Sequence, residues 1–166
     1  MTNAPLYRSQ TRPIPIPALP SLLRNALFMH ADKKKLKMKE AHAWLTHREN
    51  PASETMLGKL FGKRSNEADP DADHDMVLVV HATHLLMGTS CVSVGTSIRS
   101  LLLLAATATR GNERDDGLTI GGFPADDVDS APYFMGLGAG ADAEECVRAV
   151  MAAVLAAKVP STGTFQ

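Results

Sequence analysis

The sequence predicts a single α+β domain with a helical N-terminal half, a small central sheet and two core helices, at residues 97 to 110 and 142 to 158. Three observations lead to this prediction. Apolar residues recur at helical spacing in several segments, short runs of β-branched residues occur in the middle, and 166 residues suit one domain with a substantial core. We expect residues 1 to 20 to form an arm and residues 21 to 166 to form the globular domain.

Proline dominates the first 20 residues, at positions 5, 13, 15, 17 and 20. Proline fixes the backbone dihedral φ and removes a hydrogen-bond donor, so this segment is expected to be extended or polyproline-like rather than helical. It is expected to lie across the domain or to stay mobile. A polyproline ligand for another protein is the alternative.

Two helices are expected to follow the arm. The first begins at Ser21, because one apolar stripe contains Leu22, Leu23, Ala26, Leu27 and His30. The second is expected over residues 32 to 48, where Met38, Ala41, Trp44 and Leu45 share a face. A short third helix is expected over residues 53 to 62, followed by an acidic surface loop at residues 65 to 75.

The central sheet is expected to contain strands at residues 76 to 80, 90 to 94 and 118 to 120. Between them, residues 97 to 110 are predicted to form a helix with Ser97 as its cap and an apolar stripe that includes Ile98, Leu101 and Leu102. The last helix is expected over residues 142 to 158. Asp142 and Glu145 have the spacing of a capping box there, and Lys158 and Pro160 mark its end.

Charge is divided unevenly along the chain, although the formal net charge is only -1. Up to Arg64 the chain holds 12 Lys and Arg against 4 Asp and Glu, whereas the remainder holds 5 against 14. This asymmetry indicates an electrostatic partner for the basic half. The partner is an acidic protein surface, a nucleic acid, or the acidic half of the same chain, within one monomer or between copies.

The candidate partner-binding residues are basic and follow the first helix: Lys33, Lys34, Lys35, Lys37, Lys39, Lys63 and Arg64. Such a cluster can hold phosphates through charge-assisted contacts, or it can be a solvated face. The five lysines at positions 33 to 39 are expected in the first turns of the second helix. There they would oppose the positive end of the helix dipole, which indicates fraying or an anionic contact.

The candidate catalytic residues are Cys91, His81 and His84, because a histidine that lowers a thiol pKa creates a nucleophile. The same residue types bind zinc, but His81 and His84 would point to opposite faces of a strand, so no metal site is expected. Ordinary hydrogen-bonded histidines and an inert core thiol are the alternative interpretation.

Two weaker patterns also lack essential parts. Gly136, Gly138 and Ala141 have dinucleotide-motif spacing, but acidic residues crowd the start of the next helix. Alternating aspartates at positions 69 to 75 lack the glycine and glutamate of a calcium loop. No cofactor is therefore expected.

The chain contains two cysteines and no apolar stretch of about 20 residues, so we expect a cytoplasmic protein without a membrane segment. We predict a non-enzymatic regulatory or adaptor protein whose basic half binds an acidic protein or nucleic acid. The alternative is a cysteine-dependent hydrolase or transferase that uses Cys91 with a nearby histidine. Self-association through the oppositely charged halves is a further prediction.

Overall fold

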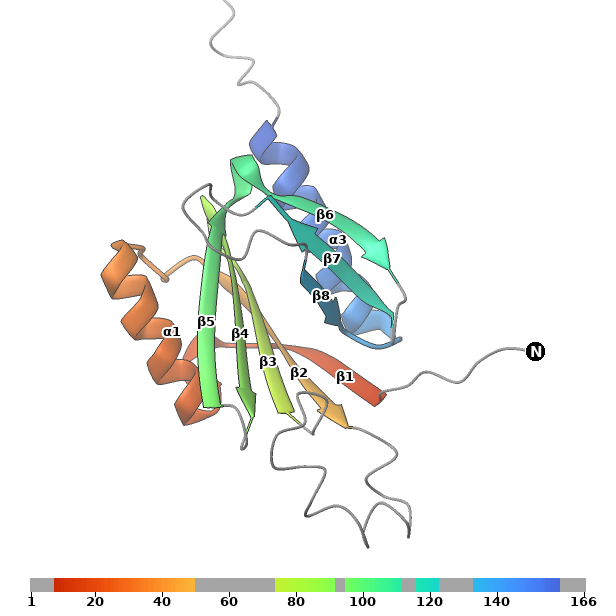
Figure 1. The fold of residues 1–166 in the computed structure, drawn as a ribbon, viewed down its shortest axis with the longest axis horizontal. Helices are drawn as coiled ribbons and strands as arrows, with labels where there is room; N and C mark the ends of the chain where they lie inside the picture. Colours follow the sequence, from red (N-terminus) through yellow and green to blue (C-terminus); the bar gives the residue numbers. More distant parts are fainter. Residues whose placement is uncertain (1–7, 50–73, 92–94, 112–115, 123–132, 159–166) are drawn as a thin grey trace, which may run out of the picture.

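The computed structural model describes residues 8–49, 74–91, 95–111, 116–122 and 133–158, which form two antiparallel sheets and two α-helices (Figure 1). The main sheet contains β1 (Arg8–Ile14), β2 (His42–Glu49), β3 (His74–Val80), β4 (His84–Cys91) and β5 (Gly95–Leu102). The second sheet contains β6 (Thr107–Gly111), β7 (Gly117–Gly121) and β8 (Tyr133–Gly136). The helices are α1 (Ser21–Lys34) and α3 (Ala141–Lys158), and two 3-10 turns are η1 (Ile16–Ala18) and η3 (Leu103–Ala105).

The main sheet has the strand order β1-β2-β3-β4-β5, and every neighbouring pair is antiparallel. Its register places Trp44 opposite Leu78, and Leu78 opposite Met87, on one face. Alternate residues of the same strands, such as Leu45 and Val77, face the other side. Both faces are buried, which explains why these strands read as nearly continuous apolar runs.

Each face of the main sheet has its own core. Helix α1 packs across β4 and β5 and buries Leu23 and Leu27 against one face. On the other face, Trp44 and Leu78 belong to a cluster with residues of the second sheet and of α3. The main sheet therefore lies between α1 on one side and the second sheet with α3 on the other (Figure 1).

Two sets of polar contacts attach α3 to β6 and to the η3 turn that precedes β6. The Lys158 ammonium donates hydrogen bonds to the carbonyl oxygens of Leu103, at 3.2 Å, Leu104, at 3.0 Å, and Ala106, so it satisfies acceptors around η3. Near the other end of α3, Arg110 and Glu144 form two hydrogen bonds of 2.6 and 2.7 Å. Both ends of α3 are thereby tied to the segment that contains β6.

The predicted fold class is wrong, because the described part of the chain is mostly β-structure and has no helical N-terminal half. The helix expected over residues 32 to 48 is absent, and most of that segment is β2. The core helix expected over residues 97 to 110 is also absent, and β5, η3 and β6 replace it. In β5, Ile98 packs against the core on one face of the main sheet and Leu101 belongs to the core on the other face, so their three-residue spacing resembles that of a helix, while Leu102 is exposed.

Other expected elements are present. Helix α1 begins at Ser21, the strand expected at residues 76 to 80 lies within β3, and the C-terminal helix is α3. Residues 8 to 14 of the expected arm form β1 and pair with β2. The expected helix at 53 to 62 lies outside the described residues, as does nearly all of the expected acidic loop. Within the described chain, no helix is long and apolar enough to cross a membrane.

Candidate anion-binding site

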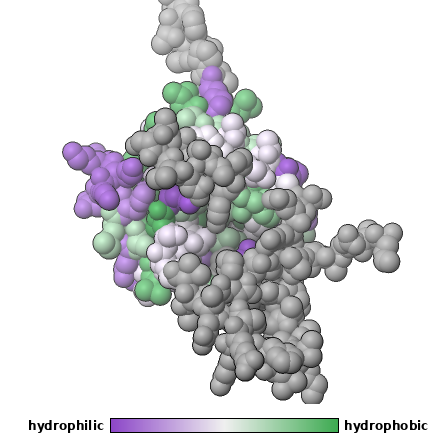
Figure 2. All heavy atoms as spheres, viewed as in Figure 1, coloured by the Kyte–Doolittle hydropathy of each residue, from purple (hydrophilic) through white to green (hydrophobic). Residues whose placement is uncertain are grey.

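Helix α1 ends in a run of lysines. Lys33 and Lys34 occupy its last turn, Lys35 is its C-cap, and Lys37 and Lys39 follow in the connection to β2. All five side chains are exposed, and hydrophilic residues cover the C-terminal end of α1 at the left of Figure 2. The sequence interpretation placed these lysines at a helix N-terminus, whereas they surround a C-terminus, where the helix dipole favours positive charge.

The backbone at Lys35 turns the lysine run around the helix end. Lys35 adopts the left-handed conformation, with φ 59° and ψ 42°. It is the one non-glycine residue of the described chain with positive φ. The Leu36 N–H then donates to the Ala31 carbonyl oxygen at 2.8 Å, which closes the helix end. This geometry usually requires glycine, so a lysine here carries a conformational cost.

The two histidines singled out from the sequence lie against the same lysine run. His81 lies in the connection from β3 to β4, and His84 is the first residue of β4. Their rings meet edge to face with centroids 5.9 Å apart, rather than pointing to opposite faces of one strand. The Nε2 atom of His81 lies 2.9 Å from the carbonyl oxygen of Lys37.

A third histidine, His30, joins them from α1. Its Nε2 atom lies 2.7 Å from the Ser100 hydroxyl group on β5. Burial lowers the pKa of His30, and the ammonium groups of Lys34 and Lys33 lower it further. We call this group of side chains the lysine–histidine corner: Lys33, Lys34, Lys35, Lys37, Lys39, His30, His81 and His84.

Burial also lowers the pKa of His84, with additional repulsion from His81, Lys34 and His30. These influences show that His84 and His30 lie within electrostatic reach of each other and of Lys34. Near neutral pH both imidazoles are therefore mainly uncharged, and the lysines supply the positive charge of the corner.

The structure does not bring Cys91 together with these histidines. Cys91 ends β4, at the opposite end of the strand from His84. The seven residue steps from His84 to Cys91 along an extended strand correspond to about 23 Å. The other thiol, Cys146, is fully buried in α3, and burial together with Glu145 raises its pKa to about 12. Of the remaining candidates, Lys63 and Arg64 lie outside the described residues.

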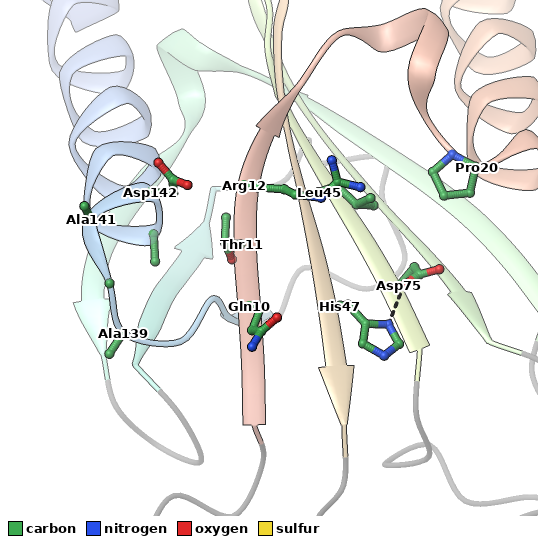
Figure 3. A pocket seen from close by; sticks show the side chains of 12 residues that line it. Gln10, Thr11, Arg12, Pro20, Leu45, His47, Asp75, Ala139, Ala141 and Asp142 are labelled. Atoms are coloured by element: carbon green, nitrogen blue, oxygen red, sulfur yellow. Dashed lines mark hydrogen bonds and ion pairs between the residues drawn. The ribbon is translucent and has the colours of Figure 1, made fainter.

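A second polar feature was missed by the sequence interpretation. A cleft of about 590 Å³ lies between the N-terminus of α3 and Pro20, over β1 to β3 (Figure 3). In it, His47 and Asp75 face each other across β2 and β3, with Nδ1 2.8 Å from Oδ1. Both side chains are partly exposed, at 54% and 36%. The pairing depends on strand register, which the sequence alone does not provide.

The described residues contain no group of three His, Cys, Asp or Glu side chains arranged to hold a metal ion. No family model, curated protein or solved structure matches the chain.

Proposed function

We propose that the protein is a non-catalytic regulatory or adaptor protein that binds an acidic partner, either a protein or a nucleic acid, at the lysine–histidine corner. This proposal rests on the observation that the charges of the corner lysines are not neutralised by carboxylates of the described chain. None of the five lysines at positions 33 to 39 forms an ion pair with another described residue. The nearby carboxylates in sequence, Asp32 and Glu40, are exposed and likewise form no ion pair within the described chain.

Two other cations of the described chain are engaged in the fold. Arg110 is paired with Glu144, and Lys158 contacts three backbone carbonyl groups. These groups support the contact between α3 and the rest of the domain. The corner lysines have no comparable structural task, which supports a role in contacting another molecule.

The test is binding of two labelled probes, a 20-nucleotide single-stranded DNA and a polyaspartate peptide, measured by fluorescence anisotropy across a salt series. We expect binding that weakens steeply as salt rises. The K33Q/K34Q/K37Q variant should bind the probe more weakly, with a smaller salt slope. For single-stranded DNA the slope should fall by about 0.7 for each phosphate contact removed.

A matched control is R12Q/R24Q/R148Q, which removes the same amount of charge from positions outside the corner. If both triple variants lose equal affinity, only net charge matters and the corner is not a binding site. Sedimentation in the same buffers tests the oligomeric alternative. Suppose that the wild-type protein forms an oligomer that dissociates as salt rises, and that the K33Q/K34Q/K37Q variant remains monomeric. This result would identify a second copy of this chain as the acidic partner.

A further inference from the structure

The histidines of the corner differ in whether their hydrogen bonds leave a ring nitrogen available to a bound anion. Both ring nitrogens of His81 form hydrogen bonds within the protein. Its Nε2–H donates to the Lys37 carbonyl oxygen at 2.9 Å, and its Nδ1 accepts from the Thr83 backbone N–H at 3.1 Å. Both ring nitrogens of His81 are thus occupied by contacts within the protein, so His81 has no further N–H to offer to an anion.

His84 has a contact that suits both of its charge states. Its Nδ1 lies 2.7 Å from the Thr83 hydroxyl group, which can donate to a neutral ring or accept from a protonated one. The Nε2 atom of His84 has no hydrogen-bond partner among the described residues. His84 can therefore gain a proton without losing a hydrogen bond, and then has a second N–H to offer to an anion.

The groups around His84 explain why an anion would promote this protonation. Helix α1 contributes Lys34 and His30, and the connection before β4 contributes His81. On β5 the neighbouring polar group is the neutral Ser100 hydroxyl, already bonded to His30. The surroundings of His84 are thus basic and disfavour its protonation, whereas a bound phosphate or carboxylate would favour it.

We propose that His84 is a proton-linked ligand of the corner: an anionic group of the acidic partner binds between Lys34 and His84, and His84 takes up one proton as it binds. This inference rests on the proposed function and adds its regulation. The same partner would bind more tightly in mildly acidic conditions. By linkage, affinity rises as the pH falls through the pKa of His84 in the complex and levels off below its pKa in the unbound protein.

The experiment measures binding of the single-stranded DNA and polyaspartate probes between pH 8 and 5.5 at constant ionic strength. The wild-type affinity should rise as the pH falls, with a slope of log affinity against pH that approaches about -1 for one linked proton. Isothermal titration calorimetry in two buffers of different ionisation enthalpy counts the protons directly. We expect an uptake of up to one proton per bound probe.

The decisive variant is H84Q, which keeps a polar side chain but cannot titrate. H84Q should lose the pH dependence and the proton uptake, so its affinity relative to wild type should fall further at pH 5.5 than at pH 8. The control H47Q changes a histidine of the distant cleft and should keep the wild-type pH profile. Thermal unfolding of both variants checks that the fold is intact.

The outcomes separate this inference from the proposed function. If H84Q binds with the same pH profile and proton uptake as wild type, the role of His84 is refuted while the corner remains a binding site. If wild type binds neither probe at any pH, the proposed function itself is refuted. If H47Q also loses the pH dependence, the linkage is spread over the protein and His84 is not its source.

Discussion

The hydroxyl group of Thr11 donates a hydrogen bond of 2.7 Å to the carbonyl oxygen of Leu137, which lies 126 residues further along the chain. The same hydroxyl lies 2.7 Å from that of Thr46 on the neighbouring strand, so Thr46 donates to Thr11. Thr11 and Thr46 are only 9% and 1% exposed. This buried chain of hydrogen bonds connects the edge of the main sheet to the segment that leads into α3.

Substitution of Thr11 by valine should destabilise the protein by about 1 to 3 kcal/mol, because it leaves the Leu137 carbonyl and the Thr46 hydroxyl buried without partners. Urea unfolding of T11V, T46V and the double variant measures the coupling. The double variant should lose less stability than the sum of the single variants, because it also removes the stranded Thr46 hydroxyl. Additive losses would show that the two hydroxyl groups act independently.

Gly88 lies where β4 passes beneath α1. A Cβ atom added to Gly88 would overlap the Cδ1 atom of Ile98 and lie 2.9 Å from Val77 Cγ1. We therefore expect G88A to destabilise the protein by about 1 to 3 kcal/mol through overpacking.

The substitution I98V provides a sharp control, because it removes the Cδ1 atom with which the new methyl group collides. Alone, I98V should cost about 0.5 to 1.5 kcal/mol. Combined with G88A, it should recover part of the loss, as measured by the free energy of unfolding in urea. A double variant as unstable as the sum of the two would place the strain at Val77 or Leu23 instead.

The elements that the sequence predicted well are those with strong local signals. Helix α3 has an apolar stripe, acidic residues in its first turn and Lys158 in its last turn. β5 has no such distinction, since apolar residues on both of its faces produce helical and strand spacing at once. Tertiary contacts on two sides therefore decided the structure of this segment, and local preference did not.

The site was predicted only in its parts. The lysine run was visible in the sequence as a candidate contact surface, and His81 and His84 were singled out for different chemistry. Their meeting depends on α1 packing across β4 and β5, which brings His30 beside Ser100, 70 residues away. The His47–Asp75 pair depends in the same way on strand register. Contacts between residues this far apart in the sequence cannot be predicted from the spacing of residues along the chain.

We expect Lys35 to lower the free energy of unfolding because of its backbone conformation, while its charge contributes to anion binding. Its left-handed backbone costs a non-glycine residue about 1 to 2 kcal/mol. Glycine avoids this strain but loses about 0.5 to 1 kcal/mol through backbone entropy. K35G should therefore stabilise the protein by about 0.5 to 1 kcal/mol in urea unfolding, while it weakens binding of the anionic probes.

The matched control is K33G, which removes the same charge from the last helical turn. Lys33 lies within α1, where glycine is a poor helix former, so K33G should destabilise the protein by up to about 1 kcal/mol. Opposite signs for the two glycine variants would support strain at Lys35. Equal destabilisation would show that the left-handed turn carries no measurable cost.

The titration of His30 and His84 should also be detectable in the unbound protein, through the pH dependence of the free energy of unfolding. His30 and His84 have pKa values below the ordinary value of 6.5, chiefly because they are partly buried. Below that pH the unfolded chain binds more protons than the folded chain, so these groups lower the free energy of unfolding as the pH falls from about 7. The loss should level off below their folded pKa values.

Urea unfolding of wild type and of H30Q/H84Q between pH 8 and 5 isolates this contribution, because carboxylates affect both proteins equally. The difference in unfolding free energy between them should shift in favour of the variant as the pH falls. Since both side chains are only partly buried, the shift should be modest. A constant difference across the range would mean that these two histidines titrate alike in the folded and unfolded states, and it would remove the electrostatic basis for proton-linked binding at the corner.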